Sequence, residues 1–242
     1  MLKLPTINGT IKRRVLVNFR ADPEVVQRLL PAPFRPKLHE GQAVVGICLI
    51  RLEHLRPRLM PEFAGFSSEN AAHRIAVEWV DEQGVPREGV FIPRRDTNSP
   101  VNLLLGGRLF PGEHHRARFK VREEEEAVAV SMRSADGEVA VSVKGRLADG
   151  MPDSSIFDSV DDASRFFEAG YLGYSMASAR DRLDALELHT DQWHVEPLAV
   201  SSVHSSFFAD ESLFPRGSVR FDHALLMRDI EHEWHTAATL YL

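Results

Sequence analysis

A single cysteine, Cys48, occurs in the 242-residue sequence, which rules out an internal disulfide and a cysteine-rich zinc site. Its apolar neighbours favour a buried, inert thiol. Long apolar runs are also missing, because charged residues interrupt every hydrophobic segment before it reaches the length of a membrane span. The N-terminal segment MLKLPTINGT has no apolar core of the signal-peptide kind. These absences predict a soluble, cytoplasmic protein.

Neither sign of charge dominates the chain. Lysine and arginine total 29 against 35 aspartates and glutamates, a formal net charge of −6. This balance argues against a general nucleic-acid or anionic-membrane partner and leaves only a local basic patch open. Hydrophobic residues make up 43% of the chain, and no repeat or low-complexity tract interrupts it. We therefore expect one globular domain over residues 1–242.

Apolar residues recur with a period of two along most of the chain, which is typical of β-strands. The predicted strands are 11–20, 43–55, 67–80, 87–95, 114–122, 127–134, 138–147, 171–177, 182–189, 193–203 and 217–235. Three short helices are expected to begin after Asp22, Ser99 and Ser159, each of which can act as an N-cap. The pattern predicts a β-rich α+β fold with a closed or nearly closed sheet.

The segment 114–122 places two adjacent histidines on opposite faces of a strand. His115 alternates with Ala117 and Phe119, whereas His114 alternates with a row of basic side chains. We therefore expect His115 to point inward and His114 to face water. His115 is then either a cavity residue or a structural histidine hydrogen-bonded at a barrel rim.

Glu69 and His73 share a predicted strand face with Ile75 and should point inward with it. A buried carboxylate is costly unless it is paired, so Glu69 requires a cation, which Arg20 or Arg74 could supply. The alternatives are a cavity-lining acid and a purely structural ion pair.

Arg94 and Arg95 lie side by side near a predicted strand end, just before Asp96. Neighbouring strand residues point to opposite faces, so at most one of the two arginines enters a cavity. An inward arginine would suit a carboxylate or phosphate ligand. The alternative is a surface ion pair with Asp96.

Two segments approximate known functional motifs but depart from them. Gly173–Ala177 approximates a hydrolase nucleophile elbow, but strand-like sequence follows it where a helix is required. His232–His235 is one residue shorter than the zinc motif H-E-x-x-H, and in a strand its two histidines would diverge. We predict neither a metal nor a cofactor.

Several segments together resemble the acetoacetate decarboxylase superfamily. They are VNFRADPEVVQRLLPAPFRP, SSENAAHRIAVEW, RRDTNSPVNLLLGGRLFP and VSSVHSSFFAD. SSEN-x-x-HR, the PRRDT strand and GGRLFPG-x-HHRARF are closer still to its uncharacterised YqjF-like group. The resemblance covers essentially the whole chain and implies a cone-shaped, closed antiparallel β-barrel with an interior cavity, often in a homo-oligomer. It also implies that Arg20 and Glu69 form an ion pair inside that cavity.

The sequence departs from the decarboxylases at the position of their Schiff-base lysine. That family has a lysine pair after a proline, whereas Pro111 is followed here by Gly112 and Glu113. The chain's lysines are Lys3, Lys12, Lys37, Lys120 and Lys144, and none has a lysine neighbour. A nucleophilic lysine needs a depressed pKa, which a second cation supplies. Schiff-base decarboxylation of acetoacetate is therefore not expected.

The sequence leads to a cavity protein that binds a small polar or carboxylate-bearing molecule, with lyase-like acid–base chemistry on a carboxylate or carbonyl compound as one hypothesis. The candidate catalytic residues are Glu69, His115 and Arg20, and the candidate ligand-binding residues are His73, Arg94 and Arg95. A non-enzymatic sensor or interaction protein of the same fold is the main alternative, and lysine chemistry through Lys144 is a third. The sequence leaves open whether the protein is an enzyme.

Overall fold

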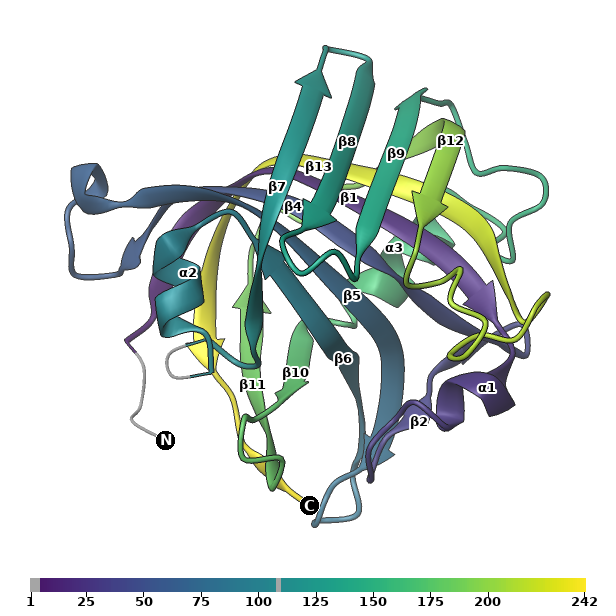
Figure 1. The fold of residues 1–242 in the computed structure, drawn as a ribbon, viewed down its shortest axis with the longest axis horizontal. Coiled ribbons are helices and arrows are strands. Elements are labelled where there is room, and N and C mark those ends of the chain that lie inside the picture. The colour runs from purple at the N-terminus through teal and green to yellow at the C-terminus, as the bar shows by residue number, and fades with distance from the viewer. Residues whose placement is uncertain (1–4, 108–109) are drawn as a thin grey trace.

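The structure is a computed structural model that describes residues 5–107 and 110–242. Strands dominate it, and they join in one large mixed sheet (Figure 1). The strands are β1 (Ile7–Ala21), β2 (Arg35–Pro36), β3 (Leu38–His39), β4 (Gln42–Pro57), β5 (Phe66–Val80), β6 (Pro86–Thr97), β7 (His114–Glu123), β8 (Ala127–Ser134), β9 (Ala140–Leu147), β10 (Leu172–Met176), β11 (Arg182–His189), β12 (Glu196–Ser205), β13 (Val219–Thr236) and β14 (Leu240–Tyr241). The helical segments are α1 (Pro23–Gln27), the 3-10 turn η1 (Glu62–Ala64), α2 (Pro100–Leu105) and α3 (Val160–Glu168). The predicted β-rich α+β class is confirmed.

Each α-helix begins where its capping residue predicts. Asp22 accepts a hydrogen bond from the backbone of Glu24, and Ser159 does the same for Asp162. Ser99 caps α2 with Pro100 in the first turn. These side chains satisfy backbone N–H groups that have no partner within a helix, which is why short polar residues mark the starts.

The sheet closes into a ring. Strand pairings run from β5 through β6, β10, β11, β13, β1 and β4 and return to β5. The expected antiparallel arrangement has two exceptions, because β10 and β7 both pair parallel to β6. The chain between β6 and β7 includes α2, which provides the crossover that a parallel pair requires.

Strands β1, β4 and β5 form a wall that is buried on both faces. Val15, Ile47 and Ile75 point to one apolar core, which also holds Phe208 and Phe214. The alternate positions point to a second core, covered by aromatic side chains of α3. Apolar alternation on these strands therefore separates two faces without distinguishing inside from outside.

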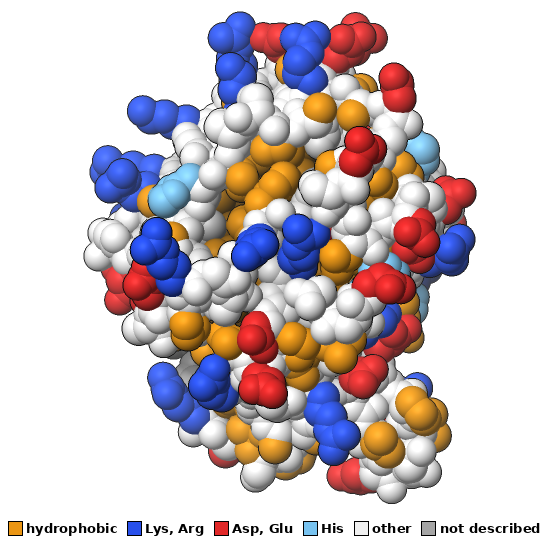
Figure 2. Space-filling view, turned by 90° about the vertical axis from the view of Figure 1, so that its right-hand side faces the viewer, with side chains coloured by type: hydrophobic (Ala, Val, Ile, Leu, Met, Phe, Trp, Pro, Cys, Tyr) orange, Lys and Arg blue, Asp and Glu red, His pale blue; other side chains and the backbone are white. Residues whose placement is uncertain are grey.

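The face shown in Figure 2 has charged side chains of both signs scattered over it, with apolar side chains gathered in the middle. Among the described residues, no helix has the length and apolar character needed to cross a membrane.

Candidate ligand-binding cavity

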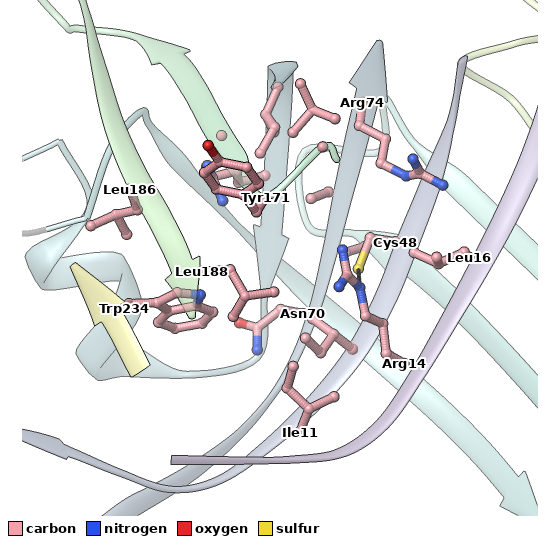
Figure 3. Close-up of a pocket in the computed structure, with 18 of the residues that line it drawn as sticks. Ile11, Arg14, Leu16, Cys48, Asn70, Arg74, Tyr171, Leu186, Leu188 and Trp234 are labelled. Atoms are coloured by element: carbon pink, nitrogen blue, oxygen red, sulfur yellow. Dashed lines mark hydrogen bonds between the residues drawn. The ribbon is translucent and has the colours of Figure 1, made fainter. Parts of the chain in front are cut away.

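A cavity of about 160 Å³ lies inside the ring of strands, with α3 forming part of its wall. Most of its lining is apolar, and Leu186, Leu188 and Trp234 lie opposite Arg14, Arg74 and Cys48 (Figure 3). An engineered apolar cavity of roughly 150 Å³ holds a benzene molecule, so this space suits a small organic molecule of that size or slightly larger.

The strand register explains why space remains there. Leu16, Cys48, Ala72, Arg95 and His114 occupy one continuous row across β1, β4, β5, β6 and β7. Small side chains fill the middle of that row, whereas long polar ones stand at its β6 and β7 end. The floor of the cavity is thus built from residues too short to fill it.

Three arginines line the cavity, and none forms an ion pair with a carboxylate within residues 5–107 and 110–242. The Arg14 Nε donates to Cys48 Sγ at 3.3 Å, and its guanidinium lies 5.7 Å from the Trp193 ring centre. The Nη1 of Arg14 is buried and has no hydrogen-bond partner.

Arg74 and Arg95 are held by neutral groups. Arg74 donates to Asn18 Oδ1 and lies over the ring of Phe167, 4.7 Å from its centre, while its Nε has no partner. Arg95 donates from Nε to Ser175 Oγ at 3.1 Å. Burial lowers the pKa of each guanidinium to about 10, so both stay charged at neutral pH.

A buried polar chain fixes the position of Arg74. Asp222 Oδ2 lies 2.7 Å from His223 Nδ1, and His223 Nε2 lies 2.9 Å from Asn18 Nδ2. The side-chain oxygen of Asn18 accepts from Arg74, so its amide nitrogen donates to His223 Nε2. His223 therefore carries its proton on Nδ1 and donates it to Asp222. The chain orients the guanidinium; it cannot conduct protons, because an amide lies within it.

His114 lines the cavity beside Arg95. Its Nδ1 lies 3.2 Å from the Gly112 carbonyl oxygen, which assigns the proton to Nδ1 and leaves Nε2 as an acceptor. Burial, followed by the charge of Arg95, lowers the pKa of His114 to about 3, so the ring is neutral at pH 7. Gly106 makes room for it, since a Cβ there would lie 2.6 Å from His114 Nδ1.

Glu69 is paired, but with a different arginine from those predicted. Arg13 Nη2 lies 2.5 Å from its Oε2, and Arg51 Nη1 lies 3.4 Å from its Oε1. These residues share one cross-strand row, Arg13 with Arg51 and Arg51 with Glu69. Arg20 lies seven residues further along β1, about 23 Å at the rise of a strand.

The predicted Arg20–Glu69 pair is therefore wrong. Arg20 instead bonds Asp222 at 3.2 Å and the carbonyl oxygen of Ser154 at 2.6 Å. Arg74, the other cation proposed for Glu69, points into the cavity on the opposite face of β5.

The remaining predicted site residues are divided between the cavity and the opposite face. Arg95 lines the cavity, whereas Arg94 forms ion pairs with Asp96 at 3.1 Å, Asp136 at 2.7 Å and Glu138 at 2.6 Å. His115 lies 3.3 Å from Asp136 at the edge of the same network.

His73 is fully buried, with its ring centre 4.5 Å from that of Phe207. Neither of its ring nitrogens has a hydrogen-bond partner. Burial, followed by the charge of Arg94, lowers the pKa of His73 to about 3. Glu69, His73, Arg94, His115 and Arg20 are all outside the cavity lining.

Sequence reasoning missed Arg14, Cys48, Asn70 and His114 as cavity residues. Lys37, which also lines the cavity, forms an ion pair with Glu88 and lies 4.3 Å from the Phe166 ring centre. The small residues at alternate positions of β4 and β5 could have indicated the cavity face of these strands, because short side chains leave space beside the sheet.

The two motif-like segments both lie in strands, as the sequence pattern predicted. Ser175 lies within β10, with no helix after it, and His232–His235 lies within β13. In the described part of the chain, no group of three or more histidine, cysteine, aspartate or glutamate side chains is placed to hold a metal ion.

Residues 9–227 match the DUF2071 family, described as "Uncharacterized conserved protein (COG2071)". The chain belongs to this family. None of the curated proteins matches it.

The solved structures that resemble it share the acetoacetate decarboxylase-like fold. Acetoacetate decarboxylase from Legionella pneumophila is 11% identical, with a TM-score of 0.62, over 98% of this chain and 88% of that one. An acetoacetate decarboxylase-like enzyme from Sphingomonas wittichii RW1 is 13% identical, with a TM-score of 0.60, over 98% and 93%. The enduracididine biosynthesis enzyme MppR, complexed with pyruvate, is 12% identical, with a TM-score of 0.63, over 100% and 91%. At these identities the likeness is one of fold, and it confirms the acetoacetate decarboxylase-like fold that the sequence resemblance implied.

Proposed function

We propose that the cavity binds a small carboxylate or carbonyl compound through Arg14, Arg74 and Arg95. The observation that carries this proposal is the absence of any carboxylate partner for these three arginines among the described residues. Enclosed cations are costly unless paired, and arginine binds carboxylates with strong charge-assisted hydrogen bonds. An anionic ligand would supply the missing partner for the free donors of Arg14 and Arg74.

The proposed chemistry on this ligand is acid–base and not covalent. His114 presents Nε2 beside Arg95. Burial is the main cause of the low pKa of the ring and the charge of Arg95 the second, and a carboxylate bound to Arg95 would offset the second. The acid–base role proposed from the sequence for Glu69 or His115 therefore moves to His114. Lys37 is engaged as a cation by Glu88, and Lys144 is exposed on β9, so neither supports a Schiff base.

The non-enzymatic alternative would be favoured by a closed apolar pocket without convergent polar groups. The cavity instead gathers three arginines, a histidine and an asparagine on an otherwise apolar wall, which is the usual make-up of a ligand site. A sensor that binds without turnover would use the same arginines, so ligand recognition is the part of the proposal to test first.

Cys48 is a built-in reporter for that test, because it is the only cysteine and lines the cavity. The measured quantity is the rate of alkylation by iodoacetate, which carries a carboxylate, divided by the rate with neutral iodoacetamide. We expect this ratio to be higher for Cys48 than for the thiol of free glutathione. Pyruvate, the ligand seen in MppR, should slow the reaction. Arg74→Met should lower the iodoacetate preference, whereas Arg118→Met, on the exposed side of β7, should leave it unchanged.

A reagent ratio equal to that of glutathione, with no protection by pyruvate, would contradict carboxylate binding. Borohydride treatment in the presence of pyruvate separately tests the non-covalent part, and mass spectrometry should find no lysine adduct.

A further inference from the structure

We propose that the ligand carries two carboxylates, so that the cavity takes a short aliphatic dicarboxylate in preference to a monocarboxylate. This inference rests on the proposed function and adds the number and placement of the anionic groups.

The guanidinium groups of Arg74 and Arg95 are anchored at opposite ends of the cavity. Their Cα positions are close, since Ala72, two residues before Arg74, pairs directly with Arg95. Arg74, however, donates to Asn18 on β1, and Arg95 donates to Ser175 on β10. In the closed ring, β1 and β10 are four strands apart through β4, β5 and β6 and three strands apart through β13 and β11, so the two anchors lie on opposite sides of the ring.

Arg14 strengthens the β1 end. Its Nε contacts Cys48, which is the cross-strand neighbour of Leu16, and its charge adds to the main effect of burial in lowering the pKa of Arg74. The cavity therefore has one cationic pole formed by Arg14 and Arg74 and a second formed by Arg95 beside neutral His114. The one carboxylate in the lining, Asp96, bonds Arg94 and is used there.

A single carboxylate can reach only one of these poles and leaves the other cation without a counter-ion. Two carboxylates joined by a short chain satisfy both poles at once. The region between the poles fits such a chain: Cys48 and Ala72 form a low floor, and Leu186, Leu188 and Trp234 form an apolar wall opposite Arg14 and Arg74 (Figure 3). The volume of about 160 Å³ limits the linker to a few carbons.

The test compares matched acids of equal chain length by isothermal titration calorimetry: succinate with butyrate, glutarate with valerate, and adipate with hexanoate. For at least one length we expect the dicarboxylate to bind roughly tenfold or more tightly, as one additional charge-assisted hydrogen bond would give. In Arg95→Met, the dicarboxylate and the monocarboxylate of each length should bind with about equal affinity, and butyrate and valerate should still bind. Arg118→Met, remote from the cavity, should keep the preference of the wild type.

Equal binding of both acids at every length would overturn the two-carboxylate inference and leave the proposed function intact. Binding of neither class, together with an unselective Cys48 reagent ratio, would overturn both. The wild-type series decides the inference by itself, so a poorly folding Arg95→Met protein would not leave it untested.

Discussion

The carboxylate of Glu69 lies between Arg13 and Arg51, and the Arg13 side chain is fully buried. The sequence argument that an inward carboxylate needs a cation was correct for this residue. The identity of the cation depends on which residues share a cross-strand row, and the row is set by the register of β1 on β4 and β4 on β5.

A double-mutant cycle tests this assignment. Glu69→Gln should lower the free energy of unfolding by about 3 kcal/mol, because Arg13 loses its shortest ion pair and keeps only Glu123. In the double variant Glu69→Gln/Arg13→Met, the change in the free energy of unfolding should differ from the sum of the two single changes by more than about 1 kcal/mol. In Glu69→Gln/Arg20→Met, it should equal that sum within about 0.5 kcal/mol. Urea unfolding of the single and double variants measures both; coupling to Arg20 would restore the pairing that the family resemblance implied.

At the scale of elements, the wall of β1, β4 and β5 depends on close backbone approach. Gly46 stands between Asn18 and Arg74 in the cross-strand register. A Cβ at this position would lie 2.5 Å from the Val17 carbonyl oxygen and 3.2 Å from Asn18 Oδ1. Glycine at this position lets Asn18 reach both His223 and Arg74.

Gly46→Ala should therefore destabilise the protein by about 1–3 kcal/mol, since backbone atoms must move to admit the methyl group. It should also weaken the iodoacetate preference at Cys48, because Asn18 no longer holds Arg74 in place. Gly150→Ala is the matched control: nothing lies within 4 Å of a Cβ there, and stability should change by no more than about 0.5 kcal/mol. Thermal unfolding checks the first effect, and the alkylation ratio checks the second. Equal stability of the two variants would show that the strands separate easily at Gly46.

For the whole molecule, buried neutral histidines link folding to pH. Burial lowers the pKa of His73 and His114 to about 3 and that of His232 to about 4. The unfolded chain protonates these rings near pH 6.5 and the folded chain does not, so the unfolded state binds more protons between those values. Stability is thus fully present above about pH 6.5 and declines as the pH falls toward 4.

His73→Leu should flatten that decline and leave stability at pH 7 unchanged or higher, because the ring nitrogens of His73 have no hydrogen-bond partner. The exposed His204 provides a control, and His204→Leu should keep the wild-type slope. Urea denaturation at several pH values between 7 and 4 gives the slopes. Identical slopes for His73→Leu and the wild type would mean that His73 takes up its proton over the same pH range in the folded and unfolded states, which would contradict the lowered pKa.

The sequence by itself determined the local structure and indicated the fold. The alternating strands, the capped helix starts at Asp22, Ser99 and Ser159, and the segments that resemble the acetoacetate decarboxylase superfamily all depend on neighbouring residues. Alternation also separated His114 from His115 and Arg94 from Arg95 correctly.

Only the tertiary structure decided which histidine and which arginine of the two adjacent pairs faces the cavity. The sequence predicted that at most one of Arg94 and Arg95 would do so, and Arg95 does. It favoured His115 over His114, and that choice was wrong. A strand buried on both faces shows apolar residues on each, so alternation cannot indicate which face the closed ring encloses. The partner of Glu69 likewise depended on the register between strands, because residues far apart in the chain become neighbours only when the ring closes.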